Sequence, residues 1–229
     1  MDYFSKAILS ALQLILQFDP EIYQIAWTSI KISLIATVFA SFFGIFLGIV
    51  TAITAFPGKK LLQQCLNTLM AMPTVMIGLI LYGILSRQGP LGHFGLLYTE
   101  TAIILGETCL ILPLIMNMTL VSVQSADPRL LTTLKVLGAK THQKIIPILS
   151  ELRFVILAGV ITGFGRAIGE VGAAMMLGGN IRGLTRTMTT AIALETSKGD
   201  FEFSLALGLL LLCIAFAVNL ILQFLNSKD

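Results

Sequence analysis

The sequence has few charged residues. Asp, Glu, Lys and Arg make up 12% of its 229 residues, whereas a soluble globular chain carries about 25%. Hydrophobic residues make up 56%, and the mean hydropathy is +0.91. So few charged side chains cannot cover the surface of a soluble protein of this length. The composition therefore indicates an integral membrane protein.

Several kinds of chemical site are also missing. The net charge of +3 and the absence of long basic runs exclude a nucleic-acid-binding surface. The phosphate-binding pattern G-x-x-x-x-G-K-[ST] is absent, so the chain does not bind ATP in that way. His93 and His142 are expected on opposite faces of the membrane and cannot share a metal. Cys65, Cys109 and Cys213 lie in apolar runs without zinc or disulfide spacing. We predict no catalytic residue, no metal site and no cofactor.

Five apolar stretches are long enough to cross a bilayer, which takes about 20 residues. None contains more than two charged residues. They are Ile32–Phe56, Leu61–Ser86, Thr101–Gln124, Phe154–Gly178 and Phe203–Leu225. The sequence therefore predicts an all-α membrane protein with about five transmembrane helices.

The first eighteen residues differ from these spans. Polar residues recur every three or four positions, with apolar residues on the opposite side of a helix. We predict an amphipathic helix over residues 1–18 that lies in the membrane interface, followed by a transmembrane domain over residues 19–229. A signal peptide and a short sixth span are the alternatives, although no A-x-A-like cleavage site precedes Asp19.

Lys and Arg are unevenly distributed between the loops. Five spans place Pro57–Lys60, Ser125–Arg153 and Asn226–Asp229 on one face, and Ser125–Arg153 is rich in Lys and Arg. Basic residues on the opposite face are diluted by acidic ones. The positive-inside rule then predicts that the C-terminus and Ser125–Arg153 are cytoplasmic and that the N-terminus is outside.

The segment over residues 125–153 contains a helix with clear ends. Asp127 can cap the free amide groups, and Pro128 suits the first helical position. Leu130, Leu134 and Leu137 then form an apolar stripe, and Gly138 stands where a left-handed cap belongs.

A second helical piece is expected from Thr141, disturbed at Pro147. The physical pattern leaves two interpretations of the whole segment. It is either a connecting loop that lies on the membrane or a docking helix for another protein.

The order Asp127-Pro128-Arg129-Leu130 followed by Val136-Leu137-Gly138-Ala139 resembles the cytoplasmic signature of permease subunits of binding-protein-dependent ABC importers. The resemblance implies a coupling helix that docks on the ATP-hydrolysing subunit. Its residues here would be Asp127, Pro128, Leu130, Leu134, Leu137, Gly138 and Ala139. The family's Glu-Ala-Ala corresponds to Thr132-Thr133-Leu134, and its later Leu-Pro is replaced by Ser150-Glu151, with Ile146-Pro147 as the nearest equivalent.

A second resemblance narrows the family. The runs Arg166–Ala173 and Leu177–Ile181 are similar to the molybdate and tungstate branch of these permeases, and Thr185-Arg186 with Thr189–Ile192 is most similar to its tungstate members. This implies a non-enzymatic subunit of a prokaryotic cell membrane that translocates tungstate, with molybdate or another anion as the alternative. Its implied partners are a second copy, two cytoplasmic ATPase subunits and an external oxyanion-binding protein.

Three charged residues fall inside the expected spans. Arg166 and Glu170 are four residues apart, so one helix face would carry both. Glu107 enters from the outer side and should lie about 10 Å deep, near the level of Glu170. We expect a buried Glu107–Arg166–Glu170 cluster. It acts either as an ion-paired lock between spans or as the lining of an anion path.

Glycine pairs mark expected sites of close helix packing. Gly44 with Gly48, Gly159 with Gly163, and Gly165 with Gly169 are each four residues apart.

The expected outer loop between the fourth and fifth spans contains Asn180, Arg182 and Arg186. These residues are candidates for contact with an arriving oxyanion or with the binding protein, and an ordinary loop is the alternative.

Two other classes of protein fit the sequence less well than a permease subunit. A stand-alone secondary carrier predicts internal inverted repeats, which the sequence does not display. A membrane scaffold or receptor does not need charged residues deep in the membrane and close together.

Overall fold

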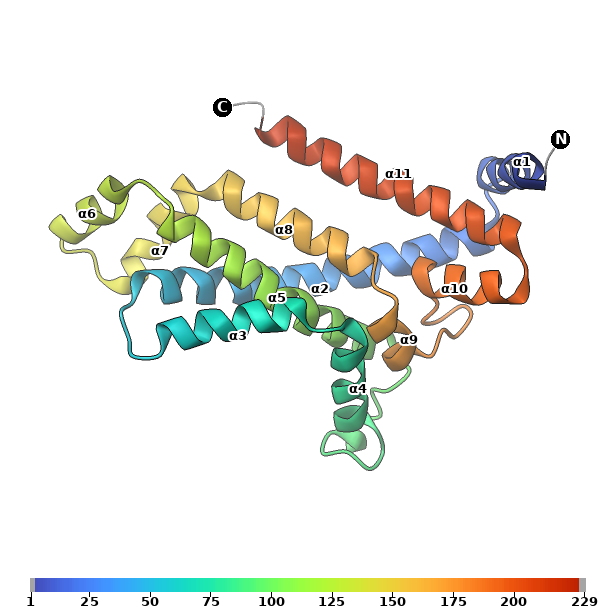
Figure 1. Ribbon diagram of the computed structural model, residues 1–229, viewed down its shortest axis with the longest axis horizontal. Helices are drawn as coiled ribbons and strands as arrows, with labels where there is room; N and C mark the ends of the chain where they lie inside the picture. Colours follow the sequence, from blue (N-terminus) through green and yellow to red (C-terminus); the bar gives the residue numbers. More distant parts are fainter. Residues whose placement is uncertain (1–2, 227–229) are drawn as a thin grey trace.

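The computed structural model describes residues 3–226, and every regular element in that range is helical (Figure 1). Three helices are long and apolar enough to cross a membrane: α2 (Pro20–Ile53), α5 (Glu100–Gln124) and α11 (Phe201–Asn226). Up to five spans result if each of two bent helix pairs counts as one. The predicted all-α membrane fold is confirmed.

Helix α2 begins twelve residues before the predicted span. The Asp19 carboxylate accepts hydrogen bonds from the Glu21 and Ile22 amides at 2.9 and 3.2 Å, and Pro20 occupies the first helical position. The helix has 34 residues, which corresponds to about 51 Å. It exceeds the hydrocarbon core of about 30 Å. The predicted start at Ile32 was wrong because it followed hydropathy and not capping.

Helix α5 lies between α2 and α8 (Arg153–Ile168), and glycines bring both neighbours close. A Cβ atom added to Gly48 would lie 2.7 Å from the Met116 carbonyl oxygen, and one added to Gly163 would lie 2.9 Å from Ile115 Cδ1. These contacts confirm the close packing predicted for those glycines. Within residues 3–226, a Cβ atom added to Gly165 would meet nothing within 4 Å, and one added to Gly169 would meet only α8 itself.

Two predicted spans are interrupted. The second consists of α3 (Lys59–Ala71) and α4 (Thr74–Leu85), which meet at 98° around Pro73. The fourth ends as α8 at Ile168, and α9 (Gly172–Gly178) follows as a separate short helix. Hydropathy alone predicts continuous helices in both places. Proline and glycine break them because proline lacks an amide proton and glycine has no helical preference.

The two interruptions lie side by side. A Cβ atom added to Gly172 would lie 2.8 Å from Val75 Cγ2 and 3.1 Å from Thr74 Oγ1. One added to Gly78 would lie 3.0 Å from the Ala173 Cα atom. Figure 1 shows the start of α4 beside α9. Both broken spans therefore contribute non-helical backbone to one region.

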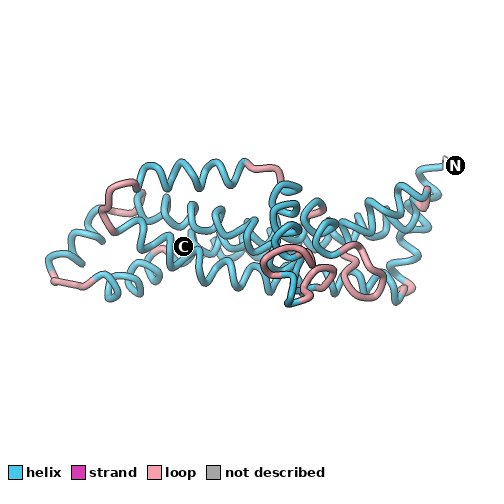
Figure 2. The backbone as a smooth tube through the Cα atoms, turned by 90° about the horizontal axis from the view of Figure 1, so that it is seen from below, coloured by secondary structure: helices cyan, strands magenta, loops and turns pink. Residues whose placement is uncertain are grey.

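The chain is elongated, and its two ends differ. The α2–α3 turn, α6 (Pro128–Val136) and α7 (Thr141–Glu151) gather at one end, while α1 (Tyr3–Leu16), α10 (Met188–Lys198) and the start of α11 lie at the other (Figure 1). Figure 2 shows the same elongated arrangement from below. The short helix η1 (Gly92–Phe94) follows α4.

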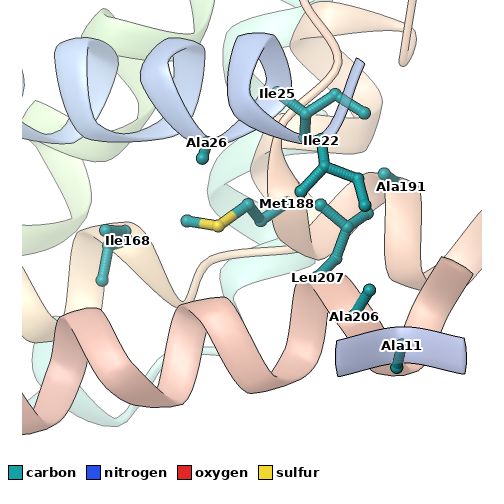
Figure 3. Packing of buried hydrophobic residues seen from close by; sticks show 9 residues of the cluster. All are labelled: Ala11, Ile22, Ile25, Ala26, Ile168, Met188, Ala191, Ala206 and Leu207. Carbon is teal, nitrogen blue, oxygen red and sulfur yellow. The ribbon is translucent and has the colours of Figure 1, made fainter. Parts of the chain in front are cut away.

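Helix α1 packs on the start of α11. Ala11 belongs to a buried cluster with Ala206 and Leu207 of α11 and Ile22 of α2 (Figure 3). Its leucines at positions 9, 12 and 16 remain exposed. The placement of residues 1–18 in the membrane interface stays a prediction.

Gly48 supplies a test of the packing. Replacing Gly48 with Ala forces the α5 backbone away from α2, and overpacking of this kind costs about 1–3 kcal/mol. Gly208→Ala is the matched control, because no atom lies within 4 Å of its added Cβ, and alanine favours a helix. We expect the thermal unfolding midpoint in detergent to fall for Gly48→Ala only. Equal midpoints would contradict the packing.

Candidate functional site

The two ends of α6 match the prediction. The Arg129 amide donates to Asp127 Oδ1 at 2.8 Å, which caps the first turn. Gly138 has a left-handed φ of 69°, and the Ala139 amide donates to the Leu134 carbonyl at 3.0 Å. The hydrogen bonds that cap both ends of α6 form within the chain, so this short helix does not need a partner protein to define its ends.

Helix α7 begins at Thr141 as expected, but it is not interrupted at Pro147. It continues through that proline to Glu151, and the bend of 81° to α8 comes at Leu152. Pro147 is the seventh residue of this eleven-residue helix, and the helix continues for four residues beyond it. The predicted disturbance at Pro147 was therefore placed five residues too early.

Most of the predicted docking stripe on α6 faces inward. Leu134 is buried in a cluster with Ile49, Val123 and Ile148, and Leu130 packs against that cluster. These side chains hold α6 on the ends of α2, α5 and α7. They are not available to a partner protein.

Three large apolar side chains described in the segment over residues 128–151 are mostly exposed. Val136, Leu137 and Ile146 are 82%, 74% and 75% exposed. Of the predicted stripe, only Leu137 belongs to this group. The sequence pattern identified the helix correctly but not which of its apolar residues the rest of the chain already covers.

The three intramembrane charges do not form the predicted lock. Glu107 and Glu170 are buried, whereas Arg166 is exposed, and no carboxylate pairs with it in the part of the chain that the structure describes. The physical reason is the end of α8 at Ile168. Glu170 is no longer one helical turn beyond Arg166, so the expected i, i+4 pair does not exist.

Glu170 instead organises the interruption after α8. Its Oε1 accepts the Ala173 amide at 3.0 Å, which satisfies a free donor at the start of α9. Its backbone carbonyl accepts the Thr189 hydroxyl at 2.6 Å. Glu170 thus ties α9 and α10 to the end of α8.

Glu107 lies in the interior of the helical bundle. Its side chain lies near the Ser33 hydroxyl and near the Glu170 carboxylate. Its Oε2 atom is buried and has no hydrogen-bond partner within the described residues. Two buried acids are a poor lining for a dianion, and the alternative role of the carboxylates in an anion path stays a prediction.

Asn180 of the outer loop has a structural role. Its side-chain amide donates to the Thr190 carbonyl at 3.3 Å, and its Oδ1 accepts the Thr190 hydroxyl at 3.0 Å. The residue is buried and has a left-handed φ of 52°. Its polar atoms are used within the chain, so the predicted substrate contact at Asn180 is not available in this structure.

Arg182 and Arg186 are paired with carboxylates. Both contact Glu21 of α2, and Arg186 also lies 3.5 Å from Glu195, which binds Lys198 at 2.8 Å. A cavity of about 220 Å³ opens among these groups. Because the acids neutralise the guanidinium charges, attraction of an oxyanion here is weakened. Arg182 is largely exposed and stays a candidate for contact with a partner protein.

Sequence reasoning missed Glu21, Glu195 and Thr189. Span counting places Glu21 on the same face as Arg182, which is the signal that could have suggested their pairing. Thr189 belongs to the run that resembles tungstate permeases, but nothing local indicates its hydrogen bond to the Glu170 carbonyl. Residues 3–226 contain no group of His, Cys, Asp and Glu side chains arranged to hold a metal ion.

Glu170 can be tested by conservative substitution. Glu170→Gln keeps an oxygen that accepts the Ala173 amide, whereas Glu170→Ala leaves this donor unpaired at a cost of about 1–3 kcal/mol. We expect only the alanine variant to lower the thermal unfolding midpoint in detergent. Glu151→Ala, at an exposed position, is the control. An equal loss in Glu170→Gln would mean that the charge matters and not the hydrogen bond.

Comparison with known proteins gives a consistent family. The chain is 41% identical over 228 residues to a tungstate uptake system permease protein of Peptoclostridium acidaminophilum, with both chains fully covered. It is 37% identical to the tungstate uptake system permease protein of Campylobacter jejuni, over 96% of this chain and 92% of the relative. A molybdenum transport system permease protein of Escherichia coli is 29% identical, over 80% and 83%. Residues 21–228 match the family described as binding-protein-dependent transport system inner membrane component, and the chain belongs to that family.

Proposed function

We propose that this chain is the permease subunit of an ABC importer for tungstate, with ATP hydrolysed by a separate subunit. The observation that carries the proposal is the full-length similarity to two tungstate uptake permeases, at 41% and 37% identity. The molybdenum relative is more distant, at 29%. Molybdate is therefore the less supported alternative substrate.

The family implies association with an ATPase and a substrate-binding protein. We infer that two copies of this chain assemble with two ATPase subunits, because five spans are few for a complete path. Closure of the ATPases would move α6 and switch the bundle between outward-open and inward-open states by rigid-body rotation. The chain itself contributes the path and not the hydrolysis.

The proposed orientation places α6 and α7 in the cytoplasm. The basic residues of residues 125–153 support this orientation through the positive-inside rule. The C-terminus would then also be cytoplasmic. The opposite end, with α10 and the Glu21–Arg182 pair, would face the binding protein outside the cell.

We infer that Val136, Leu137 and Ile146 form the contact with the ATPase. They are exposed at the proposed cytoplasmic end, where burial in lipid is not available. Burial of such side chains in a groove of a partner is the usual origin of binding energy at a helix-in-groove contact. Leu134 would hold α6 in place beneath them.

This division of roles gives a prediction. Leu137→Asp should abolish copurification of the ATPase but leave the unfolding midpoint of the permease unchanged, because the side chain makes few internal contacts. Leu134→Ala should lower the midpoint, since removal of a buried leucine costs about 2–5 kcal/mol. Loss of stability in Leu137→Asp, or retention of the ATPase by it, would contradict the assignment.

Uptake by reconstituted vesicles tests the whole proposal. The vesicles carry this chain with its ATPase and binding protein, and accumulate labelled tungstate in the presence of ATP. We expect trace unlabelled tungstate to block uptake and sulfate to have no effect. If molybdate competes as well as tungstate, the substrate assignment broadens to both oxyanions. Uptake without any ATPase would overturn the importer proposal and favour a stand-alone carrier.

A further inference from the structure

One face of α8 is exposed although the helix belongs to the bundle. Arg166 lies on it, together with Thr162, Gly165 and Gly169. The opposite face packs on α5 through Gly159 and Gly163. Around Arg166 this face presents small and polar groups with one cation, and the large apolar Val155 lies about two turns from Thr162 toward the start of α8. A surface that faces lipid is instead composed of large apolar side chains throughout.

The charge of Arg166 is uncompensated. It forms no ion pair in the described chain, and the acids predicted to neutralise it, Glu107 and Glu170, are buried. Arg166 occupies the last turn of α8. The partial negative charge of the helix end stabilises the cation without using its hydrogen-bond donors.

Arg166 lies well inside the membrane span. It is thirteen residues beyond Arg153, the first residue of α8, which is about 20 Å along the helix. The hydrocarbon core is about 30 Å thick. A charged side chain at this depth is stable where it faces water or protein and not where it faces lipid.

The backbone next to Arg166 also indicates that this residue faces water or protein and not lipid. The chain leaves the helix at Gly169 and resumes it at Gly172, beside the interruption at Pro73 between α3 and α4. Non-helical backbone at membrane depth is tolerated only inside protein or along a water-filled cavity. Interrupted helices are also a feature of substrate sites in transporters.

We propose that Arg166 lines the translocation path and binds the transported tetrahedral oxyanion directly. The inference rests on the proposed function. A second copy closes the site, because Arg166 and Gly169 stay exposed in one chain, and Thr162 and Gly165 stay exposed although they line a cavity beside α11. Arg166 of each copy then supplies one positive charge, and the two charges together match a dianion.

The chemistry of the guanidinium suits this task. Its planar fork of N–H donors binds two oxygens of an oxyanion at once and keeps its charge at any physiological pH. Glu107 and Glu170 are held away from this face by burial, so the anion meets the cation without nearby repulsion.

Substitution of Arg166 tests the contact through uptake. In the vesicle assay, Arg166→Gln should lower the initial rate of tungstate uptake about tenfold or more, as expected for loss of a charged hydrogen-bond donor. Arg166→Lys should retain an intermediate rate. Arg153→Gln, which removes an exposed arginine at the far end of α8, should transport normally. Copurification of the ATPase and the unfolding midpoint in detergent should be unchanged in all three, which separates loss of contact from misfolding.

Thiol labelling tests whether the face lines a water-filled path. Cys65, Cys109 and Cys213 are exposed and are first replaced by alanine. Thr162→Cys, which keeps Arg166, should react with a membrane-impermeant thiol reagent, and tungstate should slow the reaction. Val38→Cys is the control, because this exposed α2 residue is expected to face lipid and to remain unreactive.

The outcomes separate this inference from the proposed function. Normal uptake by Arg166→Gln, or no more labelling of Thr162→Cys than of Val38→Cys, would overturn the role of Arg166. If Thr162→Cys reacts but tungstate does not slow the reaction, the surface is accessible to water and does not bind the anion. This result would also overturn the role of Arg166. If the intact complex transports a different oxyanion, the tungstate assignment fails, and the same variants are tested with that anion.

Discussion

The close contact of α5 with α2 and α8 is the constraint on which the rest of the structure depends. Lipid tails are as apolar as leucine side chains, so the hydrophobic effect does not hold helices together within the bilayer core. Close approach of the helix backbones at glycine residues holds them together instead. Gly48 brings α2 against the Met116 carbonyl, and Gly163 brings α8 against Ile115. This contact fixes α5 as the central helix, and the interruptions, α6 and the outer loop are all placed relative to it.

The functional regions depend on departures from regular helix. A continuous fourth span would have placed Arg166 and Glu170 on one face, where each would neutralise the other. The end of α8 at Ile168 separates them. The carboxylate turns inward to cap α9, and the guanidinium stays outward. An interruption of a few residues therefore converts a pair of opposite charges, of little use to an anion, into a buried acid and an available cation.

The sequence predicted some features well for identifiable reasons. Hydropathy located α5 and α11 to within about two residues, and cap residues located both ends of α6, because these features depend on neighbouring residues alone. It failed where the outcome depends on tertiary contacts. Nothing local shows that Leu134 is covered by Ile49 and Ile148 while Leu137 is not. Likewise, the carboxylates that neutralise Arg182 and Arg186 come from Glu21, about 160 residues away, and from Glu195.

The unbroken length of α2 has a mechanical consequence. At one end Glu21 binds Arg182 and Arg186, and at the other Ile49 packs against Leu134 of α6. One rigid rod of about 51 Å thus joins the two surfaces. A tilt of about 5° about one end of such a rod displaces the other end by about 4 Å. A small displacement at the α6 end can therefore shift the Glu21 end of α2 by roughly the width of an ion. No chain of side-chain rearrangements between the two ends is required.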